Sequence, residues 1–466
     1  MDTKKLRQKI LDLAIHGKLV PQDPNDEPAS VLLERIRKEK EQLIKEGKIK
    51  APKKSKTAGD TSHYPKEMPF EVPEGWVLST VLEVFQINPK NYEDDSTEAG
   101  FVPMANISDG FEDKYSYEVK PWKSIKSGFT HFRNGDIAVA KISPCLENRK
   151  SFVVRGLPQE VGAGTTELFI FRSGQIIPEY GLLFFKSEFF ISNCVGTFNG
   201  VVGQQRVARN IIEEMPFPIP PIAEQAKIIQ SVNSIFSMIS EVENNQSALK
   251  SSAEKSKALI LDLAIHGKLV PQDPSEEPAI ELLKRINPAF QPSHNLHYGD
   301  ELPKGWLVCH LADVCSILDS QRKPINAEER AKRNVSAGEK YPYYGATGQV
   351  GTIDDYLLDG SFILLGEDGA PFLDSNSPKA YSVSGKVWVN NHAHILSPKF
   401  NDKYLLYYLN SIDYRPYVTG STRLKLTQEA MRRIVIALPP VKEQMRIVRI
   451  IDRLFNTLEK ISDAAQ

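Results

Sequence analysis

Two short polar loops carry side chains whose chemistry matches the edges of nucleic-acid bases. The first loop contains Gln204, Gln205 and Arg206, and the second contains Thr422, Arg423 and Lys425. Arginine and lysine donate to the paired acceptors of guanine, and glutamine can form two hydrogen bonds with adenine. The same residue types are common in loops that only face water, so the loops by themselves leave both interpretations open.

An aromatic segment and a pair of histidines are further candidates for chemistry. The segment 341–348 contains Tyr343, Tyr344 and Thr347, and is either a packed aromatic turn or a surface contact. His392 and His394 are two residues apart, which places both rings on one face of a strand, where two metal ligands could sit. No cysteine or acidic cluster flanks them in the sequence. We therefore expect structural histidines and no metal site.

Sequence motifs of catalysis are missing. Ser384-Gly385-Lys386 is followed by valine and lacks the upstream glycine of a phosphate-binding loop, and the chain has no G-x-G-x-x-G motif. The Asn/Asp-Pro-Pro-aromatic tetrapeptide of amino-methyltransferases is also missing. The four cysteines, Cys145, Cys194, Cys309 and Cys315, include no C-x-x-C pair, so we expect reduced thiols. These observations predict a chain without a bound cofactor.

Length and charge limit the class of protein further. The chain has 466 residues, enough for two to four domains, and no apolar run long enough to cross a bilayer, so a cytoplasmic protein is expected. The net charge of -1 argues against a protein that coats nucleic acid by charge alone. Between Arg35 and Lys56, however, ten Lys and Arg stand against three Glu. A solvated helix that runs into a tail is the simpler interpretation of this basic segment.

An internal duplication organises the chain. The 14 residues from Leu11 to Pro24 recur unchanged from Leu261 to Pro274, and Pro-Pro-x-x-Glu-Gln occurs at 220–225 and again at 439–444. The order of the repeats is cyclic, because the N-terminus carries only the first element and the C-terminus only the second. We divide the chain into a helical segment 1–62, a first block 63–217, a central helical region 218–295, a second block 296–436 and a C-terminal helix 437–466.

The helical segments have recognisable ends and apolar seams. In each copy of the repeated stretch the helix should end near His16 or His266, with Gly17 or Gly267 as a left-handed cap, and the histidines should have packing or helix-end roles. Apolar residues at alternating steps of four and three follow each Pro-Pro-x-x-Glu-Gln, which predicts that the two helices pair as an antiparallel coiled coil. The predicted seam residues are Ile228, Val232, Ile235, Ile239, Val242 and Leu249 in the central helix, and Ile447, Ile451, Leu454, Leu458 and Ile461 in the last helix.

The two blocks between the helices share a frame and differ in their loops. Both contain short apolar stretches separated by Gly, Pro, Asn and Asp, which is typical of mixed structure with many strands. Residues 134–140 of the first block match 359–365 of the second, each interpreted as a turn that leads into a buried strand. The expected fold class is α+β, with two mixed domains joined by long helices and an internal pseudo-twofold repeat.

Two variable blocks, each followed by a Pro-Pro-x-x-Glu-Gln helix, together with the duplicated LDLAIHGKLVPQDP stretch, closely resemble the specificity subunit of type I restriction-modification systems. The resemblance covers nearly the whole chain. It implies that each block is a target recognition domain that binds one half of a bipartite site in double-stranded DNA. It also implies that the coiled coil sets the spacing and docks two modification (methyltransferase) subunits, with restriction and translocation subunits in the full complex and no membrane partner.

On this resemblance the chain itself is non-catalytic, and S-adenosylmethionine, ATP and Mg²⁺ bind to the partner subunits. The candidate DNA-contacting residues are Lys141, Arg149, Lys150, Gln204, Gln205, Arg206, Arg322, Lys323, Tyr343, Tyr344, Thr347, Thr422, Arg423 and Lys425. The alternative from another functional class is a two-headed coiled-coil scaffold that binds protein partners. A fused methyltransferase or nuclease is disfavoured, because the length does not hold a catalytic domain beside two recognition blocks.

Overall fold

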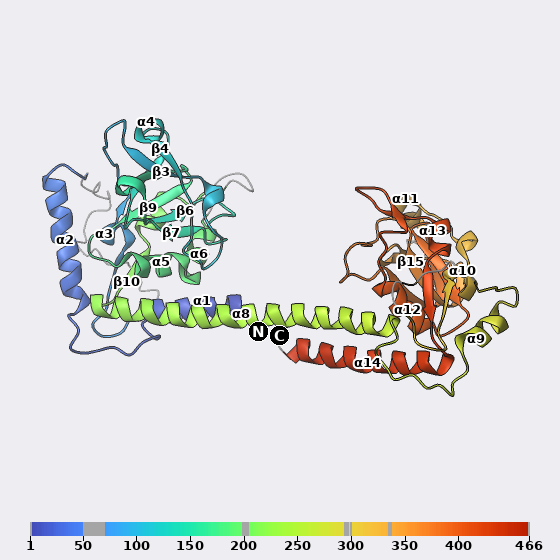
Figure 1. Cartoon of the computed structure of the whole chain (residues 1–466). Helices are drawn as coiled ribbons and strands as arrows, with labels where there is room; N and C mark the ends of the chain where they lie inside the picture. Colours follow the sequence, from blue (N-terminus) through green and yellow to red (C-terminus); the bar gives the residue numbers. More distant parts are fainter. Residues whose placement is uncertain are drawn as a thin grey trace. The chain divides into compact units, whose positions relative to one another are not determined.

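The structure is a computed structural model that describes residues 2–49, 70–197, 205–292, 298, 301–333 and 338–464. The chain divides into two compact units, residues 1–243 and 244–466, each with helices and small sheets (Figure 1). The α+β class predicted from the sequence is therefore confirmed. Helix α8 (Ile222–Ile265) begins in unit 1 and ends in unit 2. Among the described residues, no helix is both long enough and apolar enough to span a membrane.

Unit 1 is built from two four-stranded sheets and one strand pair. The sheets have the strand orders β2-β9-β6-β7 and β4-β3-β8-β5, and β1 pairs with β10. The strands are β1 (Val77–Thr80), β2 (Gln86–Ile87), β3 (Glu98–Val102), β4 (Glu118–Pro121), β5 (Thr130–Arg133), β6 (Ile137–Ala140), β7 (Ser151–Val153), β8 (Val161–Gly164), β9 (Leu168–Arg172) and β10 (Pro216–Ile219). The helices are α1 (Thr3–Ile15), α2 (Ala29–Lys45), α3 (Val81–Val84), α4 (Trp122–Ile125), α5 (Pro178–Lys186), α6 (Glu188–Val195) and α7 (Arg209–Glu213).

Unit 2 repeats this plan around one larger sheet. Six strands lie in the order β12-β17-β15-β16-β13-β14, with β11 paired to β20 and β18 to β19. The strands are β11 (Leu307–His310), β12 (Cys315–Ile317), β13 (Tyr341–Gly345), β14 (Gly348–Ile353), β15 (Leu358–Gly366), β16 (Ala380–Val389), β17 (Ala393–Pro398), β18 (Val418–Thr419), β19 (Lys425–Leu426) and β20 (Val435–Leu438). The helices are α9 (Ala279–Ile286), α10 (Leu311–Val314), α11 (Ala327–Arg333), α12 (Asp402–Ser411), α13 (Gln428–Arg432) and α14 (Val441–Ala464).

Both blocks extend slightly past the ends predicted for them. Strands β10 and β20, which close the two domains, end at Ile219 and Leu438, two residues beyond the predicted 217 and 436. The shared turn is found only in the first block. Gly135 has a φ of +87° between β5 and β6, whereas Gly360 lies within β15, so the prediction of a turn at 359–361 is wrong. The second block spans this region with one long strand.

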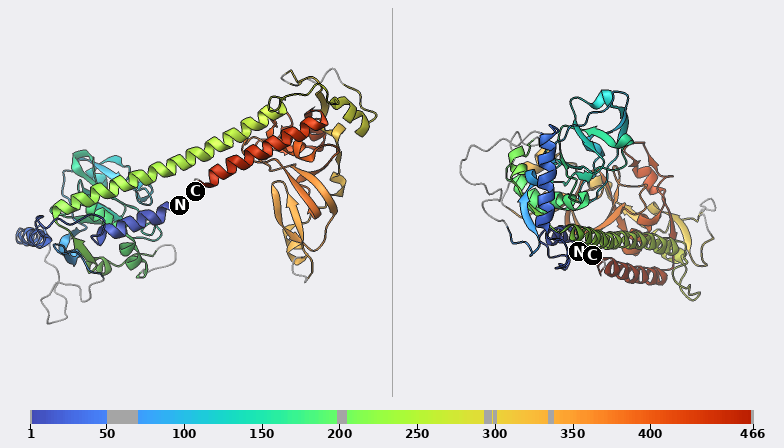
Figure 2. Two further views of the ribbon diagram at one scale, coloured as in Figure 1. Left: turned by 90° about the horizontal axis from the view of Figure 1, so that it is seen from below. Right: turned by 90° about the vertical axis from the view of Figure 1, so that its left-hand side faces the viewer.

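The two halves of α8 pair with different helices. Helix α1 lies along the first half of α8, where Arg7 pairs with Glu243 at 2.9 Å, and α14 lies along the second half, where Lys257 pairs with Glu459 at 3.4 Å (Figures 1 and 2). The pairing is antiparallel, since the start of α14 lies beside the segment that follows α8, where Arg446 pairs with Glu276. The helices therefore pair in the predicted sense, but the start of the predicted α8 seam, at Ile228 and Val232, packs with α1 and not with α14.

Burial of the seam residues follows this arrangement. Ile228 and Val232 belong to the core of unit 1 with Leu11 and Ile15 of α1, while Ile447 and Ile451 belong to the core of unit 2 with Ile265. Ile239 is buried, and Ile235, Leu454 and Leu458 are half-buried. The exposed seam positions are Val242, Leu249 and Ile461, at 38%, 36% and 45% exposure. These three are corrections to the predicted seam, because their side chains face solvent in the described chain.

Candidate nucleic-acid interface

The polar loop of each domain joins the sheet through the same set of backbone hydrogen bonds. In unit 1 the residue after β6, Lys141, donates from its amide to the carbonyl of Glu167 (3.0 Å) and accepts from the amide of Val207 (3.0 Å). In unit 2 the residue after β15, Glu367, donates to the carbonyl of His392 (2.8 Å) and accepts from Leu426 (2.7 Å). We call each set of three segments the junction of its domain.

The junction also fixes how the two domains correspond. Hydrogen bonds from Ser143 to the carbonyl of Gln205 (2.8 Å) and from Gly369 to the carbonyl of Leu424 (3.3 Å) continue the same pattern. Lys141 is thus equivalent to Glu367, which is one residue away from the correspondence predicted from the sequence. The correction arises because the match of apolar residues along a strand does not determine its hydrogen-bonding register.

In unit 1 the side chains of the junction form a charged pair. The carboxylate of Glu167 accepts two hydrogen bonds from Arg206, at 2.7 Å from Nε and 2.8 Å from Nη2. This pairing lowers the pKa of Glu167, because the guanidinium stabilises the carboxylate form. Arg206 remains about half exposed, at 48%. The arrangement holds a planar donor group at the surface end of the strand.

In unit 2 two carboxylates follow β15 directly. Glu367 lies 3.3 Å from Nζ of Lys425, and Oδ1 of Asp368 accepts a hydrogen bond of 3.0 Å from Arg423. The same oxygen of Asp368 is 2.6 Å from Nδ1 of His392. Arg423 and Lys425 are exposed, and Arg423 borders a shallow cavity of about 290 Å³ between residues 369–374 and 421–424. The predicted second loop therefore carries two exposed cations, each beside a carboxylate.

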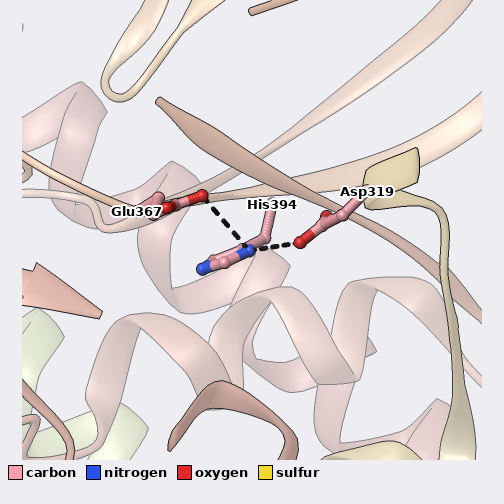
Figure 3. A group of neighbouring side chains, drawn as sticks. All are labelled: Asp319, Glu367 and His394. Atoms are coloured by element: carbon pink, nitrogen blue, oxygen red, sulfur yellow. Dashed lines mark hydrogen bonds and ion pairs between the residues drawn. The ribbon is translucent and has the colours of Figure 1, made fainter. Parts of the chain in front are cut away.

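A buried histidine links this loop to the rest of the domain by hydrogen bonds. His394 is fully buried, with Nδ1 at 2.6 Å from Asp319 (Figure 3). Its Nε2 lies 2.9 Å from the carbonyl oxygen of Leu426. Burial alone would raise the pKa of Asp319, but hydrogen bonds from His394, Gln428 and the amide of Ile395 lower it. The network ties the loop that carries the cations to the sheet.

The same cluster is a candidate metal site by composition. Ligand atoms of Asp319, Glu367 and His394 lie within 4.8 Å of one another. The guanidinium of Arg322, however, pairs with Asp319 (3.3 Å) and with Glu367, and both ring nitrogens of His394 already face hydrogen-bond partners. A cation would have to displace these contacts, so the donor set fits a charge-compensated network. His392 and His394 bind different carboxylates and do not form the paired site considered from their spacing.

Other predicted contact residues have structural roles. Arg149 is a correction: it is 6% exposed, donates to the backbone carbonyl of Lys186 (2.9 Å) and pairs with Glu188. Tyr343 is a second correction, since its side chain is 1% exposed and donates to the carbonyl of Ile325 (3.2 Å). Burial keeps both side chains away from a base edge. Lys150 is mostly enclosed and donates to the carbonyl of Ile107 (2.6 Å).

The remaining predicted residues differ in how accessible they are. Arg322 is only 15% exposed and lies inside the acidic network. Lys141, Gln205 and Tyr344 are half-buried, whereas Lys323, Thr347 and Thr422 are exposed. Gln204 lies outside the described residues. For the accessible residues, contact with DNA stays a prediction.

Sequence reasoning missed the acidic partners Glu167, Glu367, Asp368 and Asp319. A signal for two of them was present, because Glu367 and Asp368 follow an apolar strand directly, where the backbone turns to the surface.

A second set of contacts joins the helical repeats to the domains. Gln22 of the repeated stretch donates to Glu224 (3.0 Å), which also accepts a hydrogen bond from Trp76 Nε1 (2.8 Å). In unit 2, Gln272 donates to Glu443 at the same distance of 3.0 Å. We call each set the interlock of its unit. The repeated LVPQDP and Pro-Pro-x-x-Glu-Gln elements are thus two sides of one contact, which explains why they recur together.

The part of the basic segment that is described packs on unit 1. Arg37 of α2 pairs with Glu83 (2.7 Å), and Lys40 donates to backbone carbonyls at the end of α3, including that of Phe85 (3.2 Å). Burial lowers the pKa of Lys40 to about 8. These two charges therefore hold α2 against the domain, while residues 50–56 of the segment lie outside the described residues.

The structure defines a duplicated protein, in which two α+β domains share one frame, differ in their loop side chains and are joined by interlocked helices. A family model described as the type I restriction modification DNA specificity domain matches residues 73–250 and 303–465. The chain belongs to this family, the DNA specificity subunits of type I restriction-modification systems. The resemblance stated from the sequence is confirmed.

Individual relatives agree with this assignment. The chain is 34% identical to the type I restriction enzyme EcoAI specificity subunit of Escherichia coli, over 98% of this chain and 90% of the relative. It is 32% identical to the EcoEI specificity subunit of the same organism, over 99% and 91%.

Among solved structures, a chain of a type I restriction-modification system aligns with a TM-score of 0.62 at 19% identity, over 85% of this chain and 94% of that one. The specificity subunit of Thermoanaerobacter tengcongensis aligns with a TM-score of 0.53 at 18% identity, over 85% and 93%. These similarities support the fold.

Proposed function

We propose that each α+β domain binds one half of a bipartite DNA site and that the paired helices dock two modification subunits. The observation that carries the proposal is the junction, whose backbone hydrogen bonds are the same in both domains while its side chains differ. Two domains that recognise different base sequences need this arrangement. The shared backbone frame positions each loop, and the different side chains select the bases.

The charge of the chain supports the proposal that partner subunits supply most of the contacts to DNA phosphates. The overall net charge is -1, and Arg206 and Arg423 are each paired with a carboxylate. Phosphate neutralisation supplies most non-specific affinity for DNA, so this chain alone should bind DNA weakly. We expect the modification subunits to supply the missing phosphate contacts when they enclose the duplex.

Catalysis belongs to the partners in this proposal. S-adenosylmethionine would bind the modification subunits, and ATP and Mg²⁺ would bind the restriction and translocation subunits, while this cytoplasmic chain selects the site without reacting. The missing phosphate-binding and methyltransferase motifs in the sequence support this division.

Helix α8 sets the length of chain between the domains. It is continuous over 44 residues, or about 66 Å at 1.5 Å per residue. Half-sites one turn of DNA apart have centres about 34 to 36 Å apart, so a helix of this length can serve as a spacer for two readers.

The proposal is tested by co-expressing this chain with its modification subunit in a host free of DNA methylation and mapping the modified bases. We expect methylation at a single bipartite motif. Replacing residues 301–438 with the corresponding domain of a relative should change one half of the motif and leave the other half intact. A stable complex that methylates no such motif would contradict the proposal and favour the protein scaffold.

A further inference from the structure

The two junctions share a side-chain feature that their backbone frames do not explain. In unit 1 Glu167 accepts from Arg206, and in unit 2 Asp368 accepts from Arg423. The two carboxylates come from different segments, since Glu167 precedes β9 and Asp368 follows β15. Both domains therefore place a guanidinium held by a carboxylate on the polar loop, by different routes.

Stability does not account for these pairs. Arg206 and Arg423 are 48% and 64% exposed, and ion pairs in water contribute little to folding because solvent screens them. A structural pair in the same domain looks different: Arg172 and Asp136 are joined by two contacts of 2.7 Å and are 15% and 1% exposed. The exposed pairs at the junctions call for another role.

Orientation of the guanidinium is such a role. A free arginine side chain has many rotamers, and fixing it before binding removes an entropic cost from the binding step. The guanidinium is planar, and its fork of donors matches the N7 and O6 acceptors of guanine. A carboxylate beside it also weakens its attraction to phosphate, which favours a base edge over the DNA backbone.

We propose that Glu167 and Asp368 are positioning residues for base recognition, which fix Arg206 and Arg423 so that each reads a guanine in the half-site of its own domain. The inference rests on the proposed function, since it requires that each domain read one half-site. It adds the class of base and the residues that orient the reader.

The test compares methylation motifs of complexes that contain Glu167→Gln or Asp368→Asn. Glu179→Gln and Asp413→Asn are matched controls, because these carboxylates form similarly exposed pairs with Arg155 (2.6 Å) and Arg415 (2.8 Å) away from the junctions. We expect E167Q to relax the preference for guanine at one position of one half-site by about tenfold or more, and D368N to do so in the other half-site. The controls should leave both half-sites unchanged.

Arginine-to-lysine variants separate base reading from phosphate contact. Arg206→Lys and Arg423→Lys keep the charge but lose the planar fork, so a guanine reader should lose its preference and a phosphate contact should be retained. Asp368 also contacts His392 (2.6 Å), so D368N disturbs a second interaction. R423K changes only the arginine and leaves the carboxylate of Asp368 in place. Melting curves of the purified complexes should be the same for E167Q and E179Q.

Three outcomes would overturn the inference. They are an unchanged motif in both carboxamide variants, a uniform loss of methylation without change of base preference, and full retention of the motif in both lysine variants. Each is judged against a wild-type complex that methylates a bipartite motif. Without that wild-type motif it is the proposed function that has failed.

Discussion

The side-chain amide of Gln22 donates a hydrogen bond of 3.0 Å to the buried carboxylate of Glu224, 202 residues further along the chain. Gln272 and Glu443 repeat this contact at the same distance in unit 2. Each interlock joins the loop after one repeat of the helical stretch to the first turn of another helix. The N-terminal segment therefore supplies the donor, and the central helix the acceptor, of the interlock in unit 1.

Removing an interlock carboxylate should loosen one unit only. Glu224→Ala leaves the buried indole N–H of Trp76 without its acceptor, which should cost about 1 to 3 kcal/mol. The exposed amide of Gln22 loses one contact but still donates to the carbonyl of Gly17 (2.8 Å). Hydrogen exchange should increase in α1 and residues 18–24 and stay unchanged in residues 261–276, and Glu443→Ala should give the reverse pattern. Glu241→Ala, at an exposed position of the same helix, is the control. Equal exchange in both units for E224A would contradict separate interlocks.

The glycine that ends each repeated helix should not tolerate a side chain. Gly17 has a φ of +64°, and an added Cβ would lie 2.3 Å from Cγ of Pro73. Gly17→Ala should cost about 2 to 4 kcal/mol from backbone strain and overpacking. Gly47→Ala is matched in φ, at +70°, but has no atom within 4 Å, so it should cost only about 1 to 2 kcal/mol. Calorimetry of the unit 1 transition measures the difference, and equal melting temperatures would refute the role of the contact.

A buried lysine should make stability depend on pH. Lys186 is 2% exposed and donates to the carbonyls of Gly110 (2.8 Å) and Arg149 (2.9 Å), and burial lowers its pKa to about 7. Between pH 7 and the unfolded pKa of 10.5 the unfolded chain binds the extra proton, so the free energy of unfolding should rise with pH in this window. The slope contributed by this group is at most about 1.4 kcal/mol per pH unit.

Lys186→Met removes the titrating group and should remove this rise. The measurement is the difference in free energy of unfolding between wild type and K186M, by urea denaturation from pH 6 to pH 10. This difference cancels the other titrating groups. Parallel curves across the window would show that Lys186 keeps an ordinary pKa in the folded protein.

Changing the length of α8 should change the spacer of the recognised motif. The stretch from Asn245 to Leu249 is mostly exposed and can accept an insertion. Four residues inserted there lengthen the helix by about 6 Å, which is the length of about two base pairs of DNA. Both half-sites should stay the same while their separation changes. Leu249→Lys alters the same surface without changing the length, and should leave the separation as it was. An insertion that leaves the spacing unaltered would contradict the spacer role.

Much of the framework was predictable because its signals are local. The left-handed caps at Gly17 and Gly267, the helix starts after Pro-Pro and the shared frame of the two blocks follow from repeated short motifs. The seam was predictable only in part. Spacing identified Ile228 and Ile447 as buried, but it could not show that Val242 and Leu249 on the same seam are exposed.

The chemistry of the interface was less predictable because its partners are distant in sequence. Loop composition singled out Arg206 and Arg423, but not the carboxylates that hold them. The burial of Arg149 depends on how its loop packs against α5 and α6, which residue type does not reveal. Tertiary contacts of this kind decide whether a cationic side chain is free to contact a base or is held in a structural interaction.

The interlock also bears on how the chain could be shortened. Residues 11–24 and 261–274 are identical, so deleting residues 25–274 would join the two copies without altering the repeated stretch. In the shortened product Gln22 stands where Gln272 stood, opposite Glu443. One domain would then retain a complete interlock, so we expect the shortened chain to keep the contact that joins its N-terminal segment to the last helix.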